Sequence, residues 1–350
     1  MACLYVIEQG AEVTKQGNRI IVRKFGTELQ SVPAFKVEQL ILMGNIQITS
    51  QAIKFLLTEG IDTVFLTING KYRGRLVSSF SKNIDLRRKQ FKKLEEAAFV
   101  LDLAKKFVWG KLANYRVLLR RYQKEVQKEA VEKAIHSLRR LIEKVADAPD
   151  LDSLRGIEGS GSAIYFSALG QLFKNPEFRF EKRTRRPPRD PVNVLLSFGY
   201  TLLGNTIQSY IDLSGLDPYL GALHSPDYGR PSLALDLMEE FRPILVDTAV
   251  LRVVNTKAIT MKDFYVPEDA PSLPEEGEIE DLTPEDYPIL LTYEGTKKWI
   301  TMYEKRLQEL TFYPITEQRL SYRQICEQQV RLLIRHLKEE DIYQPFVLRM

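Results

Sequence analysis

The chain has 350 residues, of which 44% are hydrophobic, 27% charged and 10% aromatic, with a formal net charge of +4. This length and balance exclude a single small module, a fibrous chain and an intrinsically disordered one, and they predict about two globular domains. The only cysteines, Cys3 and Cys326, stand near opposite ends of the chain. Their separation argues against a disulfide framework or a thiolate zinc site and favours a reducing cytoplasm. The first ten residues show no basic and apolar segments of a secretory signal, so none is expected.

The first part of the chain has the pattern of a β domain. Short β-branched and aromatic runs at residues 4–7, 19–24, 40–43 and 63–68 are separated by glycine and asparagine turns, which predicts strands. Asn69 and Gly70 predict a hairpin turn before the run at 72–77. One helix is expected over 51–58, with Ser50 as its N-cap and Gly60 just past its end. We therefore expect a mostly-β, sandwich-like domain over residues 1–77.

From residue 78 onward, long stretches repeat apolar residues at helical spacing. Asp190 followed by Pro191 is a well-formed helix start, and Pro243 is expected to kink or end its helix. The helices are expected at residues 86–106, 108–146, 161–172, 191–213, 232–254, 297–309 and 317–340. The predicted fold class is therefore α+β, with a linker and helix start over 78–90 and a larger all-α domain over 91–350.

Two further stretches bear on the class of protein. Residues 191–211 carry no charge and are long enough to span a bilayer, but their polar side chains favour a helix buried inside protein, so no membrane association is expected. Residues 82–140 hold 17 Lys and Arg against 7 Asp and Glu, whereas residues 263–296 hold no basic residue. The proline- and acid-rich stretch 266–288 is predicted to be an exposed loop.

Of the three histidines, His224 stands apart, because His136 and His336 lie in basic helical patterns typical of a surface. His224 lies in a loop rich in glycine and proline, GALHSPDYGRP, which can deliver a side chain to a site. A structural histidine satisfied by local hydrogen bonds is an equally weighted interpretation.

Shortly after that loop, Asp236 and Glu239 lie three residues apart on one face of a predicted helix. Such a pair is more often a solvated acidic stripe than a site. A histidine just upstream changes the balance, because carboxylates and an imidazole together suit Mg²⁺ or Mn²⁺.

Glu158 is a third acidic candidate, since it lies among Gly156, Gly159 and Gly161 at the expected entry to an apolar helix. The glycine spacing does not make a nucleotide-binding loop, because no strand precedes it and no Gly-Lys-Ser/Thr follows. The alternative is an ordinary first-turn acid favoured by the helix dipole.

Basic residues form the remaining signal. Residues 179–189 hold six Arg and Lys in a proline-stiffened loop, which is typical of phosphate binding or of a solubilising surface loop. Together with the basic helices over 82–140, this footprint is large enough for duplex DNA, bound through its backbone rather than by reading bases. The serine and cysteine spacings do not support covalent catalysis.

Several blocks in fixed order resemble the CRISPR-associated protein one family. They are LRGIEG at 154–159 with Tyr165-Phe166, RPPRDPVNVLLSFGY at 186–200, GLDP at 215–218 with GALH at 221–224, GRPSLALDLMEEFRP at 229–243, and Tyr322-Arg323 through YQPF at 343–346. The resemblance covers nearly the whole chain.

That resemblance implies a metal-dependent DNA endonuclease and integrase of CRISPR spacer acquisition. By position, Glu158, His224 and Glu239 would be the ligands of Mg²⁺ or Mn²⁺, and Asn193 and Asp236 would be neighbouring active-site residues, with Tyr165 and Arg242 close by. It also implies a homodimer formed through the β domain, and a complex with CRISPR-associated protein two on double-stranded prespacer and repeat DNA.

In the chemistry that follows, a DNA 3′-OH attacks a repeat phosphate for strand transfer, or water attacks for cleavage. One alternative is a non-catalytic DNA-binding or DNA-bending scaffold protein that needs no metal, and another is an RNA-directed nuclease. Either would leave His224 or the acidic cluster without a catalytic role on DNA.

Overall fold

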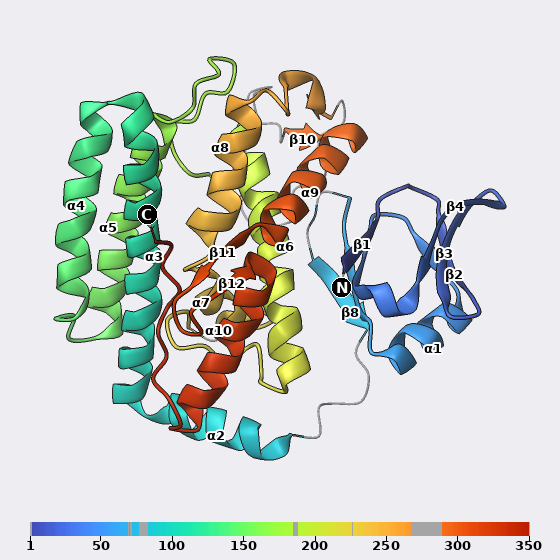
Figure 1. The fold of residues 1–350 in the computed structure, drawn as a ribbon, viewed down its shortest axis with the longest axis horizontal. Coiled ribbons are helices and arrows are strands. Elements are labelled where there is room, and N and C mark those ends of the chain that lie inside the picture. The colour runs from blue at the N-terminus through green and yellow to red at the C-terminus, as the bar shows by residue number, and fades with distance from the viewer. Residues whose placement is uncertain are drawn as a thin grey trace, which may run out of the picture. The chain divides into compact units, whose positions relative to one another are not determined.

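The structure, a computed structural model, describes residues 2–68, 70, 72–76, 83–184, 188–225, 227–267 and 289–349. The chain divides into two compact units, Met1–Lys82 and Asn83–Met350. The first unit is rich in strands and the second is mostly helical, which confirms the predicted α+β class (Figure 1).

The first unit holds two four-stranded sheets, in the orders β1-β5-β7-β8 and β4-β3-β2-β6. The strands are β1 (Ala2–Val6), β2 (Glu12–Gln16), β3 (Arg19–Lys24), β4 (Thr27–Pro33), β5 (Val37–Met43), β6 (Gln47–Ile48), β7 (Asp62–Leu66) and β8 (Tyr72–Leu76). Strands β1, β5 and β7 run parallel, whereas β2, β3 and β4 form an antiparallel meander. Alternate residues of both sheets, among them Val6, Val22 and Leu42, enter one core, which gives the sandwich-like arrangement.

One α-helix, α1 (Ser50–Glu59), packs Phe55 and Leu56 onto that core. Its N-cap is Thr49 rather than the expected Ser50, because the Thr49 hydroxyl accepts a hydrogen bond from the amide of Ala52 at 3.2 Å. Gly60 ends the helix in the left-handed conformation, as expected. A single 3₁₀ turn, Ala34–Lys36, joins β4 to β5.

The second unit is built from helices, with four short strands between the last of them. The helices are α2 (Ile84–Glu95), α3 (Ala97–Val126), α4 (Glu129–Val145), α5 (Leu151–Gly170), α6 (Pro191–Ser214), α7 (Ser232–Met238), α8 (Thr248–Asn255), α9 (Tyr293–Gln308) and α10 (Tyr322–Leu337). The strand pairs are β9 (Phe264–Tyr265) with β10 (Leu290–Leu291), and β11 (Leu310–Tyr313) with β12 (Gln318–Ser321). A 3₁₀ turn, Met261–Asp263, precedes β9. Helices α3, α4 and α5 pack side by side (Figure 1).

Several helix boundaries differ from the sequence prediction. The break expected at residue 107 lies inside α3, and the chain instead breaks at Glu96, between α2 and α3, while α9 begins at Tyr293, four residues before the expected start. The stretch expected as one helix over 108–146 is divided into α3 and α4, because Gln127 adopts a left-handed conformation that ends α3. Helix α5 begins ten residues earlier than expected, after the N-cap Asp150, so that Glu158 lies inside the helix rather than at its entry. Residues 318–321 form β12 rather than the start of the last helix.

Gly161 explains why a glycine-rich stretch can be helical here. A Cβ atom at Gly161 would lie 2.3 Å from Cδ2 of Leu112, so the missing side chain lets α5 approach α3 closely. Of the three glycines around Glu158, Gly161 therefore serves helix packing, whereas Gly156 and Gly159 face open space.

The long uncharged segment forms α6, which begins as expected, with Asp190 as N-cap and Pro191 at the first position. Most of its residues are buried by the surrounding helices, the polar Asn205, Thr206 and Gln208 among them. Within the described residues, no helix combines the length and apolarity needed to cross a membrane.

Pro243 interrupts the helical segment that follows α7, as expected. The backbone passes from α7 through a π-helical stretch, Arg242–Asp247, into α8. Two carbonyls at this break are satisfied by side chains from other elements: Glu240 O accepts from Asn114 Nδ2 at 2.8 Å, and Ile244 O accepts from Arg306 Nε at 2.9 Å. Glu239 therefore lies at the point where regular helix ends.

The two remaining histidines differ from each other. His136 is exposed on α4 beside Glu132, as expected. His336 is not a free surface residue, because its ring stacks on Phe99 with centroids 5.0 Å apart, and burial lowers its pKa.

Of the stretches singled out in the sequence, the acidic residues 268–288, Asn69 of the predicted hairpin turn, and residues 185–187 of the basic loop lie outside the described residues.

The segment after α10 is held against α3 and against Glu240, the residue after Glu239. Asn114 Nδ2 donates to Phe346 O at 2.8 Å, and the amide of Leu348 donates to Asn114 Oδ1 at 3.0 Å. The Tyr343 hydroxyl and Gln329 Nε2 both donate to the carboxyl group of Glu240, at 3.1 and 2.7 Å. Burial raises the pKa of Glu240 to about 8, although these hydrogen bonds act to lower it.

This raised pKa predicts a pH-dependent stability. Below about pH 4.5 the Glu240 carboxyl is protonated in both the folded and the unfolded chain. Between pH 4.5 and about 8 the unfolded chain loses that proton and the folded chain keeps it, so the free energy of unfolding falls as pH rises, by up to about 1.4 kcal/mol per pH unit from this group. Glu240→Gln removes this slope, and urea unfolding at pH 5, 6.5 and 8 should show the variant gaining stability relative to the parent as pH rises. Glu327→Gln, at the partly exposed partner of Arg331 on α10, is the matched control, and parallel curves for Glu240→Gln would contradict the prediction.

Candidate metal centre

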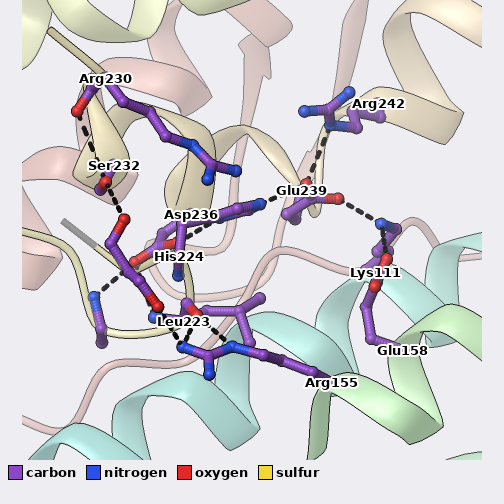
Figure 2. A network of polar contacts seen from close by, with 12 residues as sticks. Lys111, Arg155, Glu158, Leu223, His224, Arg230, Ser232, Asp236, Glu239 and Arg242 are labelled. Atoms are coloured by element: carbon purple, nitrogen blue, oxygen red, sulfur yellow. Dashed lines mark hydrogen bonds and ion pairs between the residues drawn. The ribbon is translucent and has the colours of Figure 1, made fainter. Parts of the chain in front are cut away.

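Three elements bring two carboxylates and one ammonium together. Glu158 comes from α5, Glu239 follows α7, and Lys111 lies in α3. Nζ of Lys111 contacts Oε1 of Glu158 and lies 2.6 Å from Oε2 of Glu239, so the ammonium stands between the two acids (Figure 2). Ser162, one turn after Glu158, donates a hydrogen bond to Glu158 Oε1 at 2.9 Å.

The two carboxylates differ in their contact with solvent. The Glu239 side chain is 4% exposed and that of Glu158 is 25% exposed, so Glu158 lies toward the open side of the cluster. Burial acts to raise the pKa of the Glu239 carboxyl, but Arg242 and Lys111 lower it to about 2. Arg242 Nε lies 3.2 Å from Glu239 Oε1. Glu239 is therefore an ionised acid at neutral pH, held between two cations.

Asp236 organises the histidine loop. Its Oδ2 accepts hydrogen bonds from the amides of Ala222 and Leu223, at 2.6 and 3.0 Å. Its Oδ1 accepts from the amide of His224 at 3.0 Å and lies 2.7 Å from Nδ1 of the His224 ring. One fully buried carboxylate thus gathers three successive amides and the imidazole.

The orientation of His224 follows from that contact. A carboxylate can only accept, so His224 Nδ1 donates to Asp236 and the neutral ring keeps a lone pair on Nε2. Nε2 lies 3.9 Å from Oε1 of Glu239, and Figure 2 shows the ring pointing from Asp236 toward Glu239. Both features weighed for His224 are present: local hydrogen bonds hold its ring, and its Nε2 points toward an acid.

Arg155 holds the same loop from the α5 side. Its Nε and Nη2 donate to the carbonyl of Leu223, at 3.1 and 2.9 Å, and Nη2 also donates to the Ser225 hydroxyl at 2.9 Å. On the other side, the Ser232 hydroxyl donates to Ser225 O at 3.1 Å. Because Arg155 and Glu158 share one helix, the loop with His224 is tied to the element that carries Glu158.

A buried aromatic array lies beside the acids. Tyr165 stacks on Tyr115 with centroids 3.6 Å apart, and the hydroxyls of Tyr165 and Tyr200 donate to Asp247 at 2.7 and 2.6 Å. The Arg242 guanidinium lies 4.5 Å from the centroid of the Tyr200 ring. Burial raises the pKa of Asp247 to about 6, although the two tyrosine hydroxyls act to lower it. The array fixes Arg242 in the position from which it contacts Glu239.

Asn193, predicted as a neighbour of the site, is held at the start of α6 by hydrogen bonds to the residues before that helix. Its Oδ1 accepts from Arg183 Nη1 at 2.8 Å and from the amide of Thr184 at 3.0 Å, and its Nδ2 donates to Lys182 O at 2.9 Å. In the described part of the chain it makes no direct contact with Glu158, His224 or Glu239, and its nearest link is Arg183, which lies over the Tyr200 ring. Arg183 itself is turned onto α6 rather than toward solvent, through Asn193 and Ser197.

A divalent metal fits the donors of this cluster. Oε2 of Glu239 is shielded from solvent and, although Lys111 balances its charge, makes no well-aligned hydrogen bond within the described residues. Two carboxylates and an imidazole nitrogen, with Asp236 behind the imidazole, match the preference of Mg²⁺ or Mn²⁺ for oxygen with some nitrogen. With Lys111 between the acids, no group of three or more His, Cys, Asp or Glu side chains in the described ranges is arranged closely enough to hold a metal.

Sequence reasoning missed Lys111 and Arg155. Lys111 shares one face of α3 with Phe107 and Tyr115, at spacings of four, and all three side chains are buried. A basic residue on an apolar helix face is itself a signal of a buried partner, and it could have been noticed. The partners, 47 and 128 residues farther along the chain, could not be read from spacing.

The fold and this cluster of acids and an imidazole define a class of two-domain proteins with a candidate metal centre in a helical unit. The sequence profile described as "CRISPR associated protein Cas1" matches residues 4–284. A Thermus thermophilus protein named CRISPR-associated endonuclease Cas1 3 is 39% identical over 99% of this chain and 97% of its own length. The chain therefore belongs to the Cas1 family.

Two solved structures share the fold. A Cas1 protein from Thermotoga maritima has a TM-score of 0.79 and 27% identity, over 98% of this chain and 99% of its own. A chain in a structure described as a partial Cas6-RT-Cas1–Cas2 complex has a TM-score of 0.66 and 25% identity, over 100% of this chain and 99% of its own. Both matches extend over the strand-rich and the helical unit.

The packing at Gly221 predicts how sensitive the histidine loop is. A Cβ at this position would lie 2.6 Å from Asp236 Oδ2 and 2.8 Å from the backbone carbon of Ser232, and neither atom can move freely. Gly221→Ala should therefore lower the free energy of unfolding by about 1–3 kcal/mol, measured by urea denaturation. Gly156→Ala is the matched control, because it is exposed in α5 with open space around it and should be neutral or stabilise by about 0.5–1 kcal/mol. Equal effects of the two substitutions would contradict this account of the loop.

Proposed function

We propose that the protein is a metal-dependent DNA endonuclease and integrase of CRISPR spacer acquisition, which joins DNA 3′-OH ends to phosphates of the CRISPR repeat. Family membership supports the CRISPR role, and the relative from Thermus thermophilus is itself named an endonuclease. The observation that supports the proposal is that Lys111 contacts both Glu158 and Glu239, while Nε2 of His224 lies 3.9 Å from Glu239 Oε1.

In this proposal Glu158, Glu239 and Nε2 of His224 hold Mg²⁺ or Mn²⁺. When bound, the ion polarises the scissile phosphate and lowers the pKa of the attacking hydroxyl or water. Asp236 acts through His224, since its carboxylate orients the ring and is occupied by the loop amides. Asn193 acts at one remove, by fixing Arg183 and the start of α6. No side chain has to act as a covalent nucleophile.

Basic helices α3 and α4 offer the DNA surface. Arg120, Arg139 and Arg140 are exposed there, and the pKa of Arg116 is lowered by burial and by the nearby charges of Arg120 and Arg139. Crowded positive charges of this kind are relieved by a polyanion, and contacts to phosphates bind duplex DNA without regard to sequence.

The assembly we propose is a homodimer formed through the strand-rich domain, residues 1–77, with residues 91–350 as the catalytic domain. CRISPR-associated protein two is the proposed partner on prespacer and repeat DNA, and the neighbouring structure described as a Cas1–Cas2 complex supports it. Because the proposed substrate is chromosomal DNA, we propose that the protein is cytoplasmic.

Loss of one metal ligand should abolish cleavage and strand transfer and leave DNA binding nearly unchanged. Glu158→Gln and His224→Ala should each lower Mn²⁺-dependent cleavage and strand transfer by on the order of 100-fold or more, with DNA affinity nearly unchanged. A gel with a labelled DNA 3′ end measures cleavage and strand transfer together. Glu239→Ala is a poorer test, because it would leave Lys111 and Arg242 without their buried partner and cost about 3–5 kcal/mol of stability.

The same gel and a thermal melt separate the alternatives. A metal site raises the melting temperature of the parent protein with Mn²⁺ and not that of Glu158→Gln, whereas a DNA-bending scaffold shows no response in either. Full activity in both Glu158→Gln and His224→Ala would defeat the assignment. Preferred cleavage of single-stranded RNA would favour the RNA-directed alternative.

The proposed DNA surface predicts a change in salt dependence. Arg120→Ala together with Arg139→Ala should weaken duplex binding for all sequences alike and reduce the slope of log affinity against log salt by up to about 1.8, because two phosphate contacts are lost. Fluorescence anisotropy at several salt concentrations gives both quantities. Lys297→Ala together with Lys305→Ala, two exposed substitutions on α9, is the charge-matched control. An unchanged slope in the double variant would exclude this face of α3 and α4.

A further inference from the structure

Lys111 contacts both carboxylates of the candidate metal centre. Its side chain is 5% exposed, and its Nζ contacts Glu158 Oε1 and lies 2.6 Å from Glu239 Oε2 (Figure 2). A lysine is seldom buried unless its charge is paired, and here the two acids supply that pairing. The role of Lys111 in the site therefore depends on its positive charge.

The charges of the cluster are balanced as the structure stands. Glu158 and Glu239 face Lys111 and Arg242, one cation for each acid. The ammonium occupies the position from which a cation reaches both carboxylates. A divalent ion in contact with the same oxygens would lie within a few ångströms of Nζ, and like charges so close in a buried site repel strongly.

The side chain of Lys111 can move its ammonium away from Glu158 and Glu239 while the backbone stays in place. Its Cα belongs to the middle of α3, between the buried Phe107 and Tyr115, whereas its charge is carried on a flexible four-carbon stem. The Tyr115 ring centroid is 5.6 Å from Nζ and offers a neighbouring surface for a cation. Glu158, on the other side of Nζ, is the more exposed acid.

We propose that Lys111 is a positioning residue that holds the cation position between Glu158 and Glu239 in the metal-free protein, so that a divalent ion binds by displacing its ammonium. This inference rests on the proposed function, and it adds a built-in competitor to that site. It has two consequences. The acids stay together without metal, and the affinity for metal is lower than the ligands alone would give.

The test is Mn²⁺ binding to the full chain, by isothermal titration calorimetry without DNA. Lys111→Met keeps an unbranched side chain only one atom shorter and removes its charge, so it should bind Mn²⁺ at least about tenfold more tightly than the parent protein. Lys111→Arg keeps the charge and should bind no more tightly than the parent. Lys106→Met removes a charge from the same helix, where Lys106 pairs with Asp102, and should leave the affinity unchanged.

The direction of the effect decides between competition and a purely structural role. If Lys111 only held the acids together, Lys111→Met would bind Mn²⁺ more weakly than the parent or with the same affinity, and either result overturns the proposal. Tighter binding by Lys111→Arg than by the parent overturns it as well. If Lys111→Met folds only with Mn²⁺ present, the ion has replaced the ammonium, and a larger rise in melting temperature than in the parent supports the proposal. If it does not fold under either condition, the affinity of Lys111→Arg decides.

Glu158→Gln separates this inference from the proposed function. Mn²⁺ binding that Glu158→Gln weakens, without any tightening by Lys111→Met, overturns the role of Lys111 and leaves the metal centre in place. No Mn²⁺ binding by the parent, or binding that Glu158→Gln does not change, overturns both.

Discussion

The arrangement of the helical unit depends on one constraint, which is that the ionised carboxylate of Glu239 is almost entirely shielded from water. Glu239 is 3% exposed, and a buried carboxylate is tolerated only when cations or hydrogen-bond donors face it. Lys111 and Arg242 supply the positive charge, one from α3 and one from the π-helical segment that follows α7. Each of these cations is in turn positioned by neighbours, Lys111 by Glu158 and Arg242 by the Tyr200 ring. The site is thus part of the core of the helical unit, and the packing of the helices determines its geometry.

The break at Pro243 and the histidine loop position Glu239 and His224 outside regular secondary structure. At the break, side chains of Asn114 and Arg306 satisfy carbonyls that a continuous helix would have used. In the loop, Asp236 and Arg155 satisfy amides and a carbonyl. Irregular backbone can be buried only if its polar groups find partners, so these four side chains are what allow Glu239 and His224 to approach each other.

Local signals in the sequence predicted much of this arrangement and missed the rest for identifiable reasons. Periodicity separated the strand-rich from the helical part, and Asp190-Pro191 and Pro243 marked a helix start and a helix break where the structure has them. Glu158 was expected at the entry to a helix and lies inside α5 instead, where the missing side chain of Gly161 allows close packing against Leu112. Asn193 ties Arg183 and Thr184 to α6, and its expected place beside the acids stays a prediction. The catalytic roles of Glu158, His224 and Glu239 stay predictions, although the structure brings these residues together.

By itself, the sequence determined the α+β class, the order of its two parts, the membership in a family and the short-range pair of Asp236 and Glu239, because each depends on neighbours within a few turns of the chain. Only the tertiary structure decided that Glu158 faces Glu239 across Lys111, that Asp236 turns toward the loop and not toward the second acid, and that Glu240 is buried beneath the last residues of the chain. The physical reason is that the sign and balance of a buried charge depend on which distant residues share its environment, and packing brings those residues together across a hundred positions or more.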